Sequence, residues 1–102
     1  MDMLNWTQEK INQKYEELCP YDYDSYYGKD LNGKIEEFAT ITSLYQEANY
    51  AYIAYNVMSE HGGEFNISKI FSLRLLRNHL FKINNRLKRD VELEINKIRA
   101  LN

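Results

Sequence analysis

Residues 66–101 have the apolar periodicity of one long helix, and this feature constrains the fold more than any other. The helix is expected to begin at Asn66 or Ser68 and to end near Leu101. Seven aliphatic residues fall within an arc of about 80 degrees on a helical wheel: Leu73, Leu76, Leu80, Ile83, Leu87, Val91 and Ile98. At about 1.5 Å per residue this helix spans about 50 Å, against ~30 Å for a compact domain of this size. We therefore expect an elongated molecule.

A second long helix is expected from about residue 31 to Glu60. Its apolar residues alternate three and four positions apart, which places them on one seam: Phe38, Ile41, Tyr45, Ala48, Tyr52 and Tyr55. Gly62 and Gly63 follow, and glycine readily adopts the left-handed conformation that ends a helix. Residues 61–65 are thus predicted to form a turn, so that the two long helices pack as an antiparallel hairpin.

The N-terminal part is predicted to contain one short helix, from about Asn5 to Leu18. Cys19 and Pro20 end it, because the residue before a proline avoids the helical region. Residues 20–30 lack apolar periodicity and are expected to be a loop. The predicted fold is a single all-α domain over residues 1–102, an elongated hairpin of two long antiparallel helices with a short N-terminal helix.

Three large apolar residues, Phe71, Leu75 and Phe81, lie off the core stripe of the last helix. A helix that is apolar around much of its circumference has to be covered on more than one side. We expect a homodimer in which paired hairpins form a four- or six-helix bundle. Coverage by the N-terminal helix within one chain is the alternative.

The composition argues against several classes of protein. No apolar run approaches the length that crosses a bilayer, and Met1 to Lys14 lacks the features of a signal peptide, so we expect a cytoplasmic protein. Cys19 is the single cysteine, and the two histidines are eighteen residues apart. Neither a disulfide nor a metal cluster is therefore expected, and no cofactor is predicted.

Charge is divided between the two ends of the chain. Residues 1–64 carry twelve acidic and four basic side chains, whereas residues 65–102 carry nine basic and three acidic ones. The net charge of −2 therefore conceals parts of −8 and +6. Such an asymmetry indicates that the two parts neutralise each other or that each faces a different partner.

The predicted loop is the first candidate interaction surface. It combines tyrosines with aspartates: Tyr21, Asp22, Tyr23, Asp24, Tyr26, Tyr27 and Asp30. Tyrosine offers a large contact area at low entropic cost, and aspartates present carboxylates that a basic partner would bind as it binds phosphate. This favours a small non-enzymatic regulator or inhibitor of a basic, nucleic-acid-binding protein, of the kind that phages and other mobile elements encode. Alternatively, the rings pack on the hairpin and only the aspartates face water.

The last helix offers a second candidate surface. Between residues 74 and 89 seven basic or histidine side chains occur without one acidic residue: Arg74, Arg77, His79, Lys82, Arg86, Lys88 and Arg89. Lysine and arginine neutralise phosphates, so Arg74, Arg77, Lys82, Arg86 and Arg89 could form a nucleic-acid-binding face. A solvated face, or one paired with the acidic part of the chain, is the other interpretation.

An arginine and a histidine five positions apart provide a third hypothesis. Arg74 and His79 form an arginine, four residues, histidine pattern. It resembles the short signature of the HEPN ribonucleases, which are all-helical domains that dimerise to bring two such motifs together. The resemblance covers six residues, and Leu75 stands where that family has a polar residue. It implies that Arg74 would stabilise a phosphate and that His79 would act in acid-base catalysis.

Overall fold

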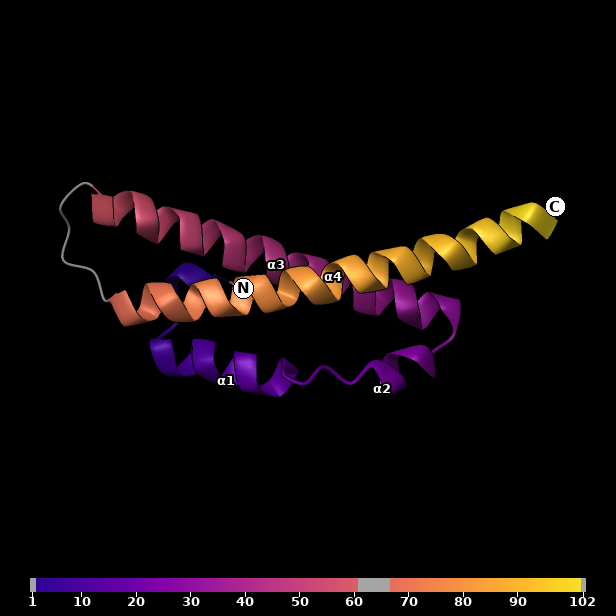
Figure 1. Cartoon of the computed structure of the whole chain (residues 1–102), viewed down its shortest axis with the longest axis horizontal. Helices are drawn as coiled ribbons and strands as arrows, with labels where there is room; N and C mark the ends of the chain where they lie inside the picture. The colour runs from indigo at the N-terminus through magenta and orange to yellow at the C-terminus, as the bar shows by residue number, and fades with distance from the viewer. Residues whose placement is uncertain (1, 61–66, 102) are drawn as a thin grey trace.

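The computed structural model describes residues 2–60 and 67–101. Within these ranges every regular element is a helix: the 3₁₀ helix η1 (Met3–Asn5), α1 (Gln8–Leu18), α2 (Tyr23–Tyr27), α3 (Leu31–Glu60) and α4 (Ile67–Leu101). The molecule measures 58 × 23 × 19 Å. The all-α class and the elongated shape predicted from the sequence are therefore confirmed (Figure 1).

The two long helices pack antiparallel along most of their length and form the main core (Figure 1). Six of the seven residues of the predicted stripe on α4 are buried, from Leu73 to Val91. The seventh, Ile98, is exposed, because Lys34 near the start of α3 already lies level with Glu94 and α4 continues beyond α3. On α3 the predicted seam supplies the buried Ile41 and Ala48, and its aromatic members are partly buried around the same core. The predicted turn at 61–65 lies outside the described residues.

The first helix begins later than expected. The side chain of Thr7 accepts a hydrogen bond from the backbone N–H of Lys10, which makes Thr7 the N-cap of α1. Asn5, the expected cap, belongs to η1 instead. Met3 and Trp6 are buried beside the hairpin, and the hydroxyl of Tyr55 on α3 donates to the backbone oxygen of Leu4. The segment before α1 is thus fixed to α3.

The segment 20–30 contains a short helix and is not wholly a loop. The side chain of Asp22 accepts a hydrogen bond from the backbone N–H of Ser25 and so caps α2. The side chain of Asp30 accepts a hydrogen bond from the backbone N–H of Gly33 and so caps the start of α3. Apolar periodicity cannot indicate a helix of five residues, because one turn has too few positions to form a stripe. The peptide bond between Cys19 and Pro20, which leads into this segment, is cis.

The N-terminal elements cover one side of the hairpin. Figure 1 shows α1 and α2 following one another along that side, where α1 packs against α4 and α2 against α3. Phe71, Leu75 and Phe81 remain 58%, 41% and 48% exposed. Coverage of these residues by α1, the alternative considered from the sequence, is therefore not observed in the single chain.

Candidate protein-interaction site

The tyrosine-rich segment is anchored to the hairpin by Tyr26. This side chain is buried, and its hydroxyl donates to the Oδ2 atom of Asp90 on α4 at 2.9 Å. Burial, together with the neighbouring carboxylate, raises the pKa of Tyr26 well above its ordinary value. A partner cannot contact this ring in the folded chain, so Tyr26 positions α2 and does not itself belong to an accessible surface.

Lys34 is the cation around which the segment is organised. It is buried, its Nζ atom lies 2.9 Å from Glu94 and 3.2 Å from Asp90, and it also lies 5.5 Å from the ring centres of Tyr26 and Tyr27. The hydrogen bond to Glu94 raises the pKa of Lys34 despite the opposing effect of burial. Lys34 therefore joins the beginning of α3 and the last part of α4 beneath α2.

Arg86 holds the exposed side of α2. Its guanidinium carbon lies 3.8 Å from the ring centre of Tyr23, and its Nε atom donates to the hydroxyl of Tyr27 at 3.1 Å. Tyr23 and Tyr27 stack with ring centres 6.4 Å apart. Arg86 is thus occupied by a cation–π contact within the chain, which joins the basic helix to the tyrosine-rich segment.

Tyr21 connects the start of the segment to α3. Its hydroxyl donates to the Oε1 atom of Glu37 at 2.7 Å, and Lys29 lies 3.9 Å from the other oxygen of the same carboxylate. Burial and the bond to Glu37 raise the pKa of Tyr21 well above its ordinary value. Its ring meets that of Tyr23 edge to face, with centres 4.8 Å apart.

The accessible part of the segment is consequently acidic. Asp22, Asp24 and Asp30 are exposed, and Tyr27 is the tyrosine of this segment with the largest exposed fraction, 41%. Tyr21 and Tyr23 are half-buried. This arrangement resembles the alternative expected from the sequence, in which the tyrosine rings pack on the hairpin and only the aspartates face water. Tyr27 differs from that alternative because its ring is exposed. We call the exposed set Asp22, Asp24, Tyr27 and Asp30 the acidic surface.

In the folded chain, some residues of the predicted nucleic-acid-binding face are exposed and others are engaged in contacts within the chain. Arg74, Lys82, Lys88 and Arg89 are exposed, and none of the four forms an ion pair within the described residues. Arg77 is half-buried against α3, where its NH1 atom lies 3.4 Å from Asn49 and its guanidinium lies 4.8 Å from the ring centre of Tyr52. Arg77 and Arg86 are thus engaged within the chain, and the other predicted contacts remain open to solvent.

Arg74 and His79 point in different directions. His79 is half-buried, its Nε2 atom donates to the backbone oxygen of Leu18, and its ring meets Tyr15 of α1. Arg74 is exposed and lies about 140 degrees further around α4. The geometry of the single chain gives the ribonuclease hypothesis no support, because the histidine is used to hold α1.

Four charged residues of this site were missed from the sequence: Lys34, Glu37, Asp90 and Glu94. Lys34 lies four positions before Phe38 and so continues the predicted seam of α3. A lysine on an apolar seam requires an anionic partner, and this signal could have identified it. The partners themselves lie about sixty positions away and become evident only once the helices are paired.

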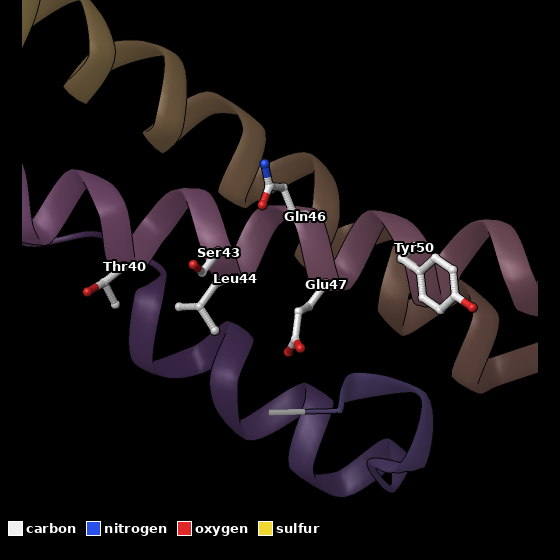
Figure 2. Close-up of a pocket in the computed structure, with 6 residues that line it drawn as sticks. All are labelled: Thr40, Ser43, Leu44, Gln46, Glu47 and Tyr50. Atoms are coloured by element: carbon white, nitrogen blue, oxygen red, sulfur yellow. The ribbon is translucent and has the colours of Figure 1, made fainter.

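A groove on α3 is lined by Thr40, Ser43, Leu44, Gln46, Glu47 and Tyr50, and has a volume of about 650 Å³ (Figure 2). The Oε2 atom of Glu47 is buried and has no hydrogen-bond partner in the described part of the chain.

The described residues contain no group of three or more histidine, cysteine or carboxylate side chains suited to a metal ion. Among the described helices, none is both long and apolar enough to cross a membrane.

Comparison with family models, with curated proteins and with solved structures found no match to this chain.

Proposed function

We propose that this chain is a small non-enzymatic regulator or inhibitor that binds a basic partner protein through the acidic surface. The main support for this proposal is that Asp22, Asp24 and Asp30 are exposed. The segment that contains them is fixed to the hairpin by Tyr26, Lys34 and Arg86. A surface that is ordered before binding loses less conformational entropy when a partner docks. Tyr27 adds an aromatic contact at the same place.

The partner of this proposal is a protein that binds nucleic acid. A site that recognises phosphates carries arginine and lysine side chains, which also pair with carboxylates. Exposed aspartates on this fixed segment would compete with the nucleic acid for that site. This is the class of inhibitor that phages and mobile elements encode.

The experiment replaces the three aspartates by asparagine. Asp22 and Asp30 are helix caps, and asparagine caps a helix about as well as aspartate, so Asp22→Asn, Asp24→Asn and Asp30→Asn together remove three charges without removing the caps. Tagged protein is used to capture partners from nuclease-treated lysate. We expect the wild type to retain a stoichiometric basic protein and the triple variant to lose it.

The matched control removes three charges from α1. Glu9, Glu16 and Glu17 are exposed, and their replacement by glutamine gives the same change in net charge. This variant should retain the partner. If both variants bind equally well, or if both lose binding, the acidic surface is not the site.

Nucleic-acid binding by α4 is the second candidate, because Arg74, Lys82, Lys88 and Arg89 are exposed without an ion pair in the described chain. On this hypothesis affinity for labelled RNA or DNA falls steeply with salt, and Lys82→Ala with Arg89→Ala reduces the slope by about two, one for each phosphate contact. An absence of binding at low salt would contradict this hypothesis.

The ribonuclease hypothesis remains third and predicts an RNA cleavage activity that His79→Ala abolishes.

We further propose that the chain is a homodimer. Five side chains in the half of the hairpin formed by the end of α3 and the beginning of α4 are each about half exposed: Ile53, Val57, Phe71, Leu75 and Phe81. Together they offer roughly 500 Å² of apolar surface, since a large side chain presents about 150–250 Å² when free. That is a large part of the ~800 Å² that each partner buries in a standard interface.

A further inference from the structure

The groove on α3 contains an unsatisfied carboxylate oxygen. The Oε2 atom of Glu47 is buried, although the side chain as a whole is partly exposed, and it accepts no hydrogen bond within the described residues. A buried carboxylate oxygen without a donor is costly, on the order of 1–3 kcal/mol or more. A cation that enters the groove and pairs with the accessible part of this carboxylate offsets that cost.

The groove is open because α1 packs against α4 and not against α3. Figure 2 shows the Glu47 carboxylate and the Leu44 side chain extending from α3 on the side where α1 lies. Thr40, Ser43, Glu47 and Tyr50 are spaced three or four residues apart, so they follow one stripe of α3 over about 15 Å. The stripe is long enough to accept an extended side chain that lies along the helix.

The chemistry of the lining is suited to a guanidinium group. Glu47 supplies the negative charge, and the hydroxyl oxygens of Thr40 and Ser43 are additional acceptors. Tyr50 is 65% exposed at one end of the groove and offers a ring face on which a planar cation can stack. Arginine combines a planar face with five donors, whereas lysine provides a single rotating ammonium group.

We propose that the groove around Glu47 is a binding site for an arginine side chain of the partner protein. The source of the arginine rests on the proposed function. The recognition of a guanidinium group is argued only from the residues that line the groove. Arginine is expected because its fork of donors can pair with the Glu47 carboxylate and a neighbouring hydroxyl together. The site would give the partner a second contact, apart from the acidic surface.

The test uses N-acetyl-arginine amide as the probe and the full chain labelled with nitrogen-15. We expect saturable changes in amide chemical shift confined to residues 40–50 and their neighbours. N-acetyl-citrulline amide has nearly the same shape without the charge and should cause no such change. N-acetyl-lysine amide should bind several-fold more weakly than the arginine probe.

Two variants decide whether Glu47 is responsible. Glu47→Gln should weaken binding of the arginine probe at least tenfold, because the charge is lost while the shape is kept. Glu36→Gln is the matched control, since Glu36 is exposed on the same helix three turns before Glu47 and outside the groove lining. It should bind as the wild type does.

Three outcomes would overturn the proposal: shifts that do not localise to the groove, equal effects of the arginine and citrulline probes, or unchanged binding by Glu47→Gln. None of them bears on the acidic surface, because the probe contains no partner protein. Conversely, the triple asparagine variant leaves the groove intact. If it loses the partner while the probe still binds, the two sites are separate.

Discussion

At the scale of single residues, the acidic surface depends on side chains that a partner cannot contact. Tyr26 and Lys34 are buried and, with the partly exposed Asp90, form one cluster in which a hydroxyl, an ammonium and a carboxylate satisfy one another. Because each group has a partner, the cost of removing them from water is offset by hydrogen bonds and charge. The cluster therefore fixes α2 while leaving Asp22, Asp24 and Asp30 exposed in and beside it.

We predict that Tyr26→Phe destabilises the protein by about 1–2 kcal/mol. The substitution keeps the buried ring but removes the hydroxyl that donates to Asp90, and a hydrogen bond to a charged group contributes about this much. Urea unfolding followed by circular dichroism measures the change. Tyr50→Phe is the control, because Tyr50 is 65% exposed, and it should have no measurable effect. Equal stability of both variants would contradict the role of the bond.

Stability should also fall at alkaline pH because of Tyr21 and Tyr26. Their pKa values are raised in the folded chain by burial and by the bonds to Glu37 and Asp90. At pH above about 10, the unfolded chain loses these protons while the folded chain keeps them. The stabilisation is complete below pH 10 and declines above it by up to about 1.4 kcal/mol per pH unit for each tyrosine.

Thermal unfolding at pH 9, 10 and 11 tests this prediction. The double variant Tyr21→Phe, Tyr26→Phe cannot ionise at these positions, so its stability should decline less steeply than that of the wild type. Lys34, whose pKa is also raised, is present in both proteins and does not affect the comparison. Identical slopes would show that the two tyrosines titrate as in the unfolded chain.

At the scale of helices, the ion pairs of Lys34 connect α3 to α4. Lys34→Met leaves Asp90 and Glu94 without their cation, with side chains 23% and 35% exposed. Removing one member of a fully buried pair costs about 3–5 kcal/mol, and we expect about 2 kcal/mol here because both carboxylates reach water. Chemical denaturation measures the loss.

Lys29→Met is the control for that prediction. Lys29 also pairs with a carboxylate, but the distance to Glu37 is 3.9 Å and both side chains are considerably exposed. Its removal should change the free energy of unfolding by less than about 0.5 kcal/mol. If Lys34→Met were equally harmless, the connection between α3 and α4 would rest on apolar packing alone.

The long helices could be predicted from the sequence, whereas the tyrosine-rich segment could not. A stripe such as Leu73 to Val91 repeats over many turns, so local periodicity is sufficient to identify it. The folding of α2 depends on Arg86 and Asp90, which lie about sixty positions from the tyrosines they contact. Contacts of this kind leave no periodic signal in either segment.

At the scale of the whole molecule, the two long helices carry opposite charges. Residues 31–60 contain four glutamates and one lysine, whereas residues 67–101 contain nine basic and three acidic residues. Within the described residues, the tyrosines of segment 20–30 contact α4 at Arg86, and Lys34 of α3 pairs with Asp90 of α4. Arg74, Lys82, Lys88 and Arg89 are exposed on the same hairpin that exposes Phe71 and Ile53.

This distribution suits a dimer in which α3 of each copy packs against α4 of the other. Two hairpins related by a two-fold axis along the helices form a four-helix bundle in which all neighbouring helices are antiparallel. Acidic α3 then faces basic α4, and the exposed apolar residues are buried between the copies. Sedimentation equilibrium should give a mass of twice 12.2 kDa.

We predict that Ile53→Lys combined with Phe71→Glu produces a monomer. Each substitution removes apolar area and places a charge opposite a helix of the same sign, lysine against α4 and glutamate against α3 of the partner copy. Helical content measured by circular dichroism should be unchanged, because both positions are exposed in the single chain. Leu101→Glu, at the opposite end of α4 and 87% exposed, should remain dimeric. A wild-type monomer at a concentration of 0.1 mM or above, or a double variant that still dimerises, would exclude this face as the interface.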